Sequence, residues 1–350
     1  MIDVGLIGFG LGGRYFHAPL IHAVPGLRLA AVVQRSSDTA ARLYPGARVV
    51  SSVEELLAID SIRLVVISTP NQTHFSLAVQ CLEAGRDVVV DKPITPTLHE
   101  TLALFRVARK CGRLLTVSHT RRFDADFHAV RDVVAGGELG QILRFDTHYD
   151  RYRPTSRPNF WREQPGPGSG ILLDIGPHLI DHALILFGLP AAVSADIRIE
   201  RSGFVTDDAF DICFFYPGSL RAYLHETMLS VTPRPRFVIL GDKGTFVKNE
   251  MDALEPMLRR EEIPKGESWV IDPEENWGVL TTVVDGQTQK RKVASHGDWR
   301  EFYANVRDAI LGKAELLVTP RQIIDVMVAL HLAQESSSRR CAVPWRNVKL

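Results

Sequence analysis

The sequence lacks closely spaced cysteines, a long hydrophobic run and a net charge. Its four cysteines, Cys81, Cys111, Cys213 and Cys341, are scattered, so their spacing indicates neither a disulfide framework nor a CxxC metal motif. No apolar run is long enough to span a bilayer, and no charged leader with an apolar core precedes the first expected strand. We therefore expect a cytoplasmic protein with reduced thiols.

The balance of charges excludes two classes of partner. Lys and Arg together number 41, as do Asp and Glu, which gives a formal net charge of zero. Such a chain exerts no long-range attraction on nucleic acid or on an anionic membrane, so neither partner is expected. At 350 residues the chain exceeds the usual size of one hydrophobic core, which favours two domains.

A glycine-rich segment follows the first apolar stretch, residues 2–7, and precedes a segment suited to a helix. Gly8 permits a tight turn, Gly10 allows the backbone to approach a pyrophosphate, and Gly13 allows the helix to lie close to the strand. The N–H groups of that helix would meet the anion. We predict that this segment binds a dinucleotide through Gly8, Phe9, Gly10, Leu11, Gly12 and Gly13.

The second expected strand, residues 27–33, ends where an adenosine ribose would lie. Sites that prefer NAD place Asp or Glu at this position, but here the strand runs into Gln34, Arg35 and Ser36. A guanidinium beside hydroxyl groups suits a 2′-phosphate, so the sequence favours NADP. The alternative, that Arg35 is a solvated loop residue and both cofactors bind, stays open.

Strands and helices alternate through the first third of the chain. This order predicts a doubly wound parallel sheet, in which ligands bind at the carboxyl ends of the strands. The expected strands are 2–7, 27–33, 64–68, 87–90 and 114–118, and the expected helices begin near 13 and cover 37–43, 52–58, 71–85 and 97–111.

Beyond residue 121 the pattern changes to successive strands. Residues 143–149 alternate apolar and polar, the period of a strand with one solvated face. We predict a Rossmann domain over 1–121 and an α+β domain over 122–350. Its largely antiparallel open sheet would leave one face for a homodimer or homotetramer contact. Further strands are expected at 193–200, 209–216, 220–228, 236–240 and 245–248, and helices at 171–187, 298–311 and 320–335, with Asp298 and Thr319 as caps of the last two.

Three side chains are candidates for acid–base chemistry. Lys92 directly follows the strand at 87–90 and could donate to a substrate oxygen; the alternative is a surface lysine. Asp174 and His178 lie four residues apart on one helix face, where the carboxylate could hold the imidazole tautomer and raise its pKa. Alternatively, Asp174 caps the helix and His178 is structural. His182 continues this spacing, but without HExxH or CxxC no metal is expected.

Five segments in the same order resemble the Gfo/Idh/MocA family of oxidoreductases. Those segments are GFGLGG at 8–13, STPNQTH at 68–74, DKP at 91–93, RRF at 121–123 and GILLDIGPH at 170–178. Within the family, DRYRP at 150–154 and FWREQ at 160–164 are most similar to the NADP-dependent scyllo-inositol dehydrogenase branch. The resemblance implies hydride transfer between NADP and a secondary alcohol of a cyclic polyol or sugar. Related alternatives are a sugar dehydrogenase or reductase and a non-catalytic NADP-binding regulator.

The resemblance also implies roles for individual residues. Lys92 would bind substrate and the nicotinamide ribose, with a cis peptide before Pro93; His178 would accept the proton, and Asp174 would orient the substrate. Asp91 stands where the family usually has Glu, which we expect to loosen the support of Lys92 without removing it. Implied cofactor contacts are Thr69, Pro70, Asn71 and His74, and implied polyol contacts are Arg122, Tyr152, Arg153, Trp161 and Arg162.

Overall fold

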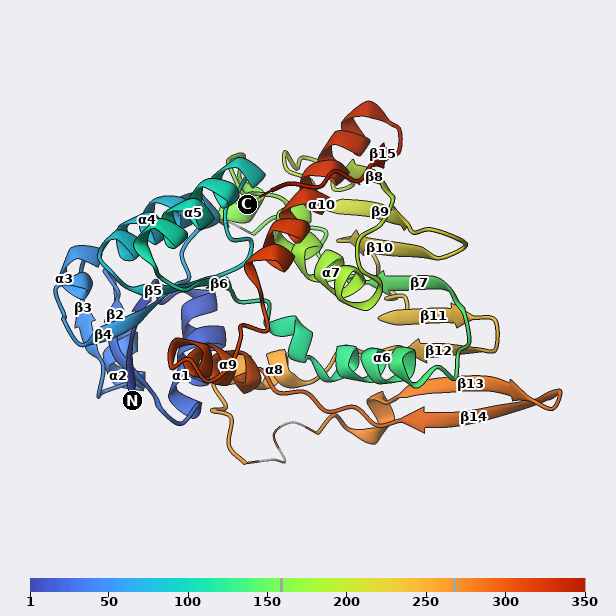
Figure 1. The fold of residues 1–350 in the computed structure, drawn as a ribbon, viewed down its shortest axis with the longest axis horizontal. Coiled ribbons are helices and arrows are strands. Elements are labelled where there is room, and N and C mark those ends of the chain that lie inside the picture. Colours follow the sequence, from blue (N-terminus) through green and yellow to red (C-terminus); the bar gives the residue numbers. More distant parts are fainter. Residues whose placement is uncertain (158–159, 267–268, 270, 350) are drawn as a thin grey trace.

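Short apolar segments in the first third of the chain form a parallel sheet, as predicted (Figure 1). The sheet has six strands rather than the five expected, because residues 48–50 also pair with the second strand. The computed structural model describes residues 1–157, 160–266, 269 and 271–349. The strands are β1 (Ile2–Ile7), β2 (Leu27–Val33), β3 (Arg48–Val50), β4 (Ile62–Ile67), β5 (Asp87–Val90) and β6 (Leu115–Val117). They are hydrogen-bonded in the order β3-β2-β1-β4-β5-β6. Every residue of β1 and of β5 is buried, as a sheet covered on both faces requires.

Helices connect these strands, and their ends follow local chemistry. The long helix before β6 begins where the Thr97 side chain accepts from Glu100 N and ends at Gly112, whose φ is 61°. The helix expected from residue 13 opens instead with a π-helical turn. The helical segments are η1 (Gly12–His17), α1 (Ala18–Ala23), α2 (Thr39–Leu43), α3 (Val53–Leu57), η2 (Asn71–Thr73), α4 (His74–Glu83) and α5 (Leu98–Cys111).

The rest of the chain forms an open nine-stranded sheet that is antiparallel except between its two central strands. These strands are β7 (Ile142–His148), β8 (Ala192–Arg198), β9 (Ala209–Phe215), β10 (Arg221–Thr227), β11 (Phe237–Gly241), β12 (Gly244–Lys248), β13 (Gly278–Val284), β14 (Gln287–Val293) and β15 (Val343–Pro344). Their order is β14-β13-β12-β11-β7-β10-β9-β8-β15, and β7 runs parallel to β10. The sequence analysis missed β13, β14 and β15. The structure thus has the predicted fold class, a Rossmann-like parallel sheet followed by an α+β part.

Helices pack on one face of the second sheet (Figure 1). Along β10 the alternation is strict: Ala222 and Leu224 are buried on the helical side, while Tyr223 and His225 lie half-buried on the other. The predicted open face is therefore present in this chain. The remaining helical segments are η3 (Thr120–Phe123), α6 (Ala125–Gly136), η4 (Trp161–Glu163), α7 (Ile171–Phe187), α8 (Leu254–Arg259), η6 (Glu274–Asn276), α9 (Arg300–Ile310) and α10 (Pro320–Arg339).

One long helix contacts elements of both sheets. The last helix, α10, packs against α5 and β6 on one side and against α7 and β8 on the other. It begins at the predicted cap, Thr319, which forms a capping box with Gln322. The predicted domain boundary at 121/122 falls inside η3 and stays a prediction. Within the described residues, no helix combines the length and the apolar character needed to cross a membrane.

Candidate active site

The carboxyl ends of the parallel strands meet along one edge of the first sheet. Ile7 pairs with Val33 on one side and with Ile67 on the other, and Ile67 pairs with Val90. The segments that follow these four residues therefore begin side by side. A cavity of about 650 Å³ opens along this edge, and residues of both sheet regions form its wall.

The glycine segment forms one end of this cavity, with residues 8–12 in its wall. Gly8 has a φ of 97°, and a Cβ there would lie 2.5 Å from the carbonyl oxygen of Ser68. A Cβ on Gly10 would meet nothing within 4 Å, so the backbone there faces open space. Gly13 lies outside the wall and packs against the Gly8 carbonyl, which leaves no room for a side chain. These features fit a dinucleotide whose pyrophosphate lies against the segment.

Gln34, Arg35 and Ser36, the predicted contacts of the adenosine ribose, lie in the cavity wall. The Gln34 side chain donates to Ser37 Oγ at 2.7 Å and accepts from Ala40 N at 2.9 Å, so it is fixed within the loop. Arg35 and Ser36 are exposed. Among the described residues, no carboxylate of this loop lines the cavity, so nothing in its wall here repels a phosphate.

The segment after β4 divides into residues that face the cavity and residues behind it. Thr69 and Pro70 line the wall. Asn71 is buried and donates to the Gly168 carbonyl at 2.8 Å, while both ring nitrogens of His74 lie 2.9 Å from carbonyl oxygens, those of Thr69 and Pro93. The structure therefore places Asn71 and His74 as supports of the cofactor wall rather than as part of it.

Lys92 lies in the wall directly after β5, and the Lys92–Pro93 peptide is cis, as the resemblance implied. Its Nζ donates to Asp174 Oδ1 at 2.7 Å and also to the Asp174 carbonyl oxygen. Only 12% of the Lys92 side chain is exposed. Burial lowers the pKa of this ammonium, and the charge of Asp174 opposes the shift. The interpretation of Lys92 as an ordinary surface lysine is wrong.

Asp174 and His178 both line the cavity from α7. Asp174 is not the cap of this helix. The first N–H groups of α7 are taken by Asp207, whose carbonyl accepts from Ile171 N at 2.9 Å and whose carboxylate accepts from Leu172 N at 2.7 Å. Because Asp207 satisfies the helix end, the Asp174 carboxylate is free to face the cavity.

The predicted interaction between Asp174 and His178 is not present. Asp174 pairs with Lys92 and, at 3.2 Å, with Arg162 Nε, whereas His178 Nδ1 has no hydrogen-bond partner in the described part of the chain. Burial alone would raise the pKa of Asp174, but Lys92 and Arg162 hold it well below its usual range. Burial lowers the pKa of His178, and the charges of Lys92 and Arg121 act in the same direction. The expected rise in the imidazole pKa is therefore wrong, and His178 is neutral at pH 7.

The five predicted polyol contacts separate into two groups. Arg153, Trp161 and Arg162 line the cavity. Arg122 does not: it is 5% exposed, and its guanidinium binds both carboxylate oxygens of Asp181, at 2.6 and 2.7 Å. Tyr152 pairs with Leu229 outside the wall and is 56% exposed. The structure thus places neither Arg122 nor Tyr152 at the expected substrate contact, because an ion pair engages one and solvent surrounds the other.

Several arginines in the wall were missed by the sequence analysis. Arg151 and Arg157 extend the group formed by Arg153 and Arg162, and Arg121 and Arg259 lie nearby in the wall. The signal that could have found the first two is local density, since residues 151–162 contain four arginines.

The residues considered for a metal do not converge. The His182 ring stacks on Phe127 with centroids 3.9 Å apart, and its Nε2 lies 3.1 Å from the Arg121 carbonyl. The His182 ring is therefore engaged in the core, where it is fully buried.

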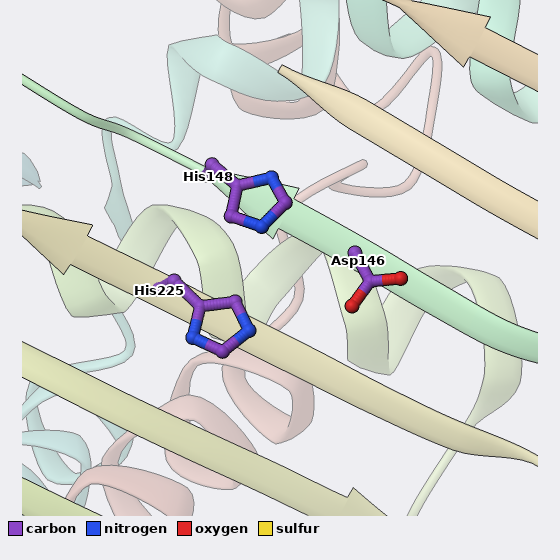
Figure 2. A group of neighbouring side chains, drawn as sticks. All are labelled: Asp146, His148 and His225. Atoms are coloured by element: carbon purple, nitrogen blue, oxygen red, sulfur yellow. The ribbon is translucent and has the colours of Figure 1, made fainter. Parts of the chain in front are cut away.

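A different group on the open sheet face has suitable ligand types, namely Asp146, His148 and His225 (Figure 2). Their potential ligand atoms lie within 4.8 Å of one another. However, Arg144 Nε already binds the Asp146 carboxylate at 2.7 Å, and His225 Nδ1 binds Asp211. These arginine and carboxylate contacts satisfy the cluster as a hydrogen-bonded network.

Comparison with known proteins agrees with this geometry. The family model described as "Oxidoreductase family, NAD-binding Rossmann fold" matches residues 2–119, and the "GFO/IDH/MocA C-terminal domain" matches residues 127–247. The uncharacterised oxidoreductase YdgJ of Escherichia coli is 41% identical over 98% of both chains. The scyllo-inositol 2-dehydrogenase (NADP(+)) IolW of Bacillus subtilis is 34% identical over 97% of this chain and 94% of its own.

Solved structures show the same fold over the whole chain. The putative oxidoreductase yvaA of Bacillus subtilis superposes with a TM-score of 0.95 at 34% identity, covering 99% of this chain and 98% of its own. The putative oxidoreductase YPO2259 of Yersinia pestis gives 0.94 at 38% identity, with the same coverage. The chain therefore belongs to the Gfo/Idh/MocA family of NAD(P)-binding oxidoreductases.

Proposed function

We propose that the protein transfers hydride between NADP and a secondary alcohol of a cyclic polyol or sugar, with scyllo-inositol as the reference compound. The observation that carries this proposal is the meeting of Lys92, Asp174 and His178 in the wall of the cavity that begins at the glycine segment. The name of the IolW relative supports the choice of cofactor and compound.

Lys92 is proposed to stabilise negative charge on the reacting oxygen. Its two hydrogen bonds to Asp174 leave one ammonium N–H uncommitted, since a protonated lysine has one donor more than these bonds use. Because Lys92 lies in the cavity wall, that donor would be available to a bound substrate. A cation fixed in advance in a partly desolvated site stabilises a developing alkoxide more than water does.

His178 is proposed to accept the hydroxyl proton. An imidazole must be neutral to act as a base, and burial together with Lys92 keeps the pKa of His178 well below 6.5. When bound, NADP supplies the hydride acceptor. Gly8 and Gly10 would hold its pyrophosphate, and Arg35 and Ser36 would hold its 2′-phosphate.

Steady-state kinetics test this proposal. Purified protein is assayed for NADPH formation with NADP and a panel of inositols and aldoses, and for the reverse reaction with the corresponding ketones and NADPH. We expect turnover of at least one cyclic compound and higher kcat/KM with NADP than with NAD. Tight NADP binding without turnover of any compound, in either direction, would instead favour a non-catalytic regulator.

We also propose that the open face of the second sheet packs against a second copy of the chain. Half-buried Tyr223 and His225 on that face have no covering element among the described residues. Sedimentation velocity should give a dimer or tetramer, and Tyr223→Glu should shift it toward monomer. A wild-type monomer at micromolar concentration would contradict the proposal.

A further inference from the structure

Cationic side chains outnumber carboxylates in the cavity wall. Eight lysine and arginine side chains line it, against three carboxylates, Asp91, Asp174 and Glu255. Six of the cations are arginines in the part of the wall outside the first sheet's nucleotide segments: Arg121, Arg151, Arg153, Arg157, Arg162 and Arg259.

Four of these arginines are neutralised by carboxylates. Arg121 binds Asp124 at 3.1 Å and also Glu255, and Arg259 binds Glu255 at 2.7 Å. Arg162 binds Asp174 at 3.2 Å, and Arg157 binds Glu163 at 3.2 Å. Each of these four guanidinium groups is therefore engaged in an ion pair within the protein.

Arg151 and Arg153 differ, because neither makes an ion pair with any residue that the structure describes. The Arg151 guanidinium stacks 4.4 Å above the Tyr149 ring, which orients it without neutralising it. A nearby carboxyl, Glu226, does not pair with Arg151, because its buried oxygens accept no hydrogen bond from the described residues. Burial raises the pKa of Glu226 well above its usual value, although Arg151 opposes this.

Arg153 lies among other cations. Burial lowers the pKa of its guanidinium, and the charges of Arg151, Arg157 and Arg259 act in the same direction. Like charges at this spacing repel one another, and a bound anion would offset the repulsion. The wall is thus arranged for a negative ligand at this point.

The phosphates of the cofactor are expected elsewhere. Arg35 follows β2, and β1 and β4 separate β2 from β5, after which Lys92 lies. Arg151 lies in the part of the cavity wall near Lys92, because its charge helps to lower the pKa of Asp174, the partner of Lys92. Arg151 therefore flanks the proposed reacting centre rather than the adenosine end, and Arg153 lies two residues further along the same segment of the wall.

We propose that the alcohol substrate carries an oxyanion, a carboxylate or a phosphate, which Arg151 and Arg153 bind beside the reacting carbon. This inference rests on the proposed function. It narrows the substrate class from cyclic polyols and sugars in general to those that carry a negatively charged group. Guanidinium groups bind both oxyanions in the same two-pronged way, which is the chemistry that the two groups share.

Matched substrates test the inference. D-glucose, D-glucuronate and D-glucose 6-phosphate, and scyllo-inositol with its monophosphate, are compared for kcat/KM with NADP. Hydrogen bonds to charged groups contribute about 1.5–3 kcal/mol, so the acidic member should exceed its neutral partner by about 10–100-fold. The carboxylate and phosphate arms identify which oxyanion is used.

Variants assign the effect to the two arginines. Arg151→Gln and Arg153→Gln should each reduce the acidic-to-neutral ratio of kcat/KM at least about tenfold. Arg291→Gln, on β14 and paired with Glu138, removes one arginine far from the cavity and should leave the ratio unchanged. Thermal unfolding of each variant shows whether it is folded.

Calorimetric titration of the NADP complex gives a readout independent of turnover. The acidic sugar should bind more tightly than its neutral partner, and Arg153→Gln should abolish the difference. If neutral compounds are turned over with the same kcat/KM as their acidic partners, the inference fails while the proposed function stands. If nothing is turned over, the proposed function fails, and equal binding of acidic and neutral sugars would overturn the inference as well.

Discussion

Asp174 accepts hydrogen bonds from Lys92 through both its side chain and its backbone, and the Nζ–Oδ1 distance is 2.7 Å. Lys92 follows a strand of the parallel sheet, whereas Asp174 lies on α7 beneath the second sheet. This contact therefore fixes the lysine at the junction of the two halves of the molecule. Without it, a buried ammonium would lose both its orientation and its charge compensation.

Asp174→Asn should separate these two effects. The amide retains an acceptor but removes the negative charge that opposes the lowered pKa of Lys92, so that pKa falls further. Because Lys92 must be protonated to act, the alkaline limb of kcat/KM should move to lower pH. Loss of orientation should reduce kcat by up to about 10²-fold. Asp196→Asn, an exposed position on β8, is the control. An unchanged alkaline limb would contradict the role of Asp174.

His178→Ala should remove the proton acceptor. We expect kcat for alcohol oxidation to fall about 10²-fold or more, while the Kd of NADP stays within a few-fold, because His178 is not part of the glycine segment. Calorimetric titration with NADP gives the Kd, and steady-state kinetics give kcat. Equal loss of cofactor affinity would mean that the histidine acts through structure.

The pH profile of the wild-type enzyme should show the environment of His178. The imidazole binds a proton only below its lowered pKa, so the neutral, active form persists through pH 6.5. Oxidation should therefore stay constant from neutral pH down past 6.5 and decline only at more acidic pH. A decline of the oxidation rate that begins at or above pH 6.5 would contradict the lowered pKa of His178.

Arg35→Ser should shift the cofactor preference. The exposed guanidinium is the only cation of the 34–37 loop, and a charged hydrogen bond to a 2′-phosphate contributes about 1.5–3 kcal/mol. The ratio of kcat/KM for NADP to that for NAD should therefore fall about 10–100-fold. Arg42→Ser, on neighbouring α2, is the matched control. A ratio that stays constant would show that another group binds the phosphate.

The parts that local sequence patterns determine were predicted well. The bounds of α7 and of β1, β2 and β5 coincide with those expected, because each is a continuous, largely apolar segment of the sequence. β14 was missed because its residues are almost all exposed and polar, so only pairing with β13 makes it a strand.

The site was predictable where position along a strand or helix decides it, as for Lys92, Asp174 and His178. Partners distant in sequence could not be predicted. Arg122 forms an ion pair with Asp181, 59 residues away, and Asp174 forms one with Lys92, 82 residues away. The first pairing overturns a substrate contact that the family resemblance implied, and the second replaces the His178 partner that helical spacing suggested for Asp174. Neither could be predicted, because these ion pairs form through the tertiary fold.

Asp91 provides the last prediction, since the family usually has glutamate there. Its Oδ1 accepts from Lys92 N at 2.7 Å, and its Oδ2 lies 3.4 Å from His17 Nε2. His17 is held in turn by the Tyr303 hydroxyl at 2.6 Å. Burial alone would raise the pKa of Asp91, but His17 and Lys92 hold it below its usual range. The shorter carboxylate is therefore anchored and charged.

If charge rather than length matters at this position, Asp91→Glu should keep kcat within about threefold, whereas Asp91→Asn should reduce it about tenfold or more by weakening the support of Lys92. The Asp91→Asn change removes a negative charge that raises the pKa of Lys92, so this pKa should fall. The alkaline limb of kcat/KM should therefore move to lower pH. Asp87→Asn is the control. Asp87 is the first residue of β5, at the end opposite to Asp91, and its carboxylate accepts a hydrogen bond from Leu114 N. This variant should lower the melting temperature without changing the pH profile. Equal kinetics for the Glu and Asn variants would show that the carboxylate only fills space.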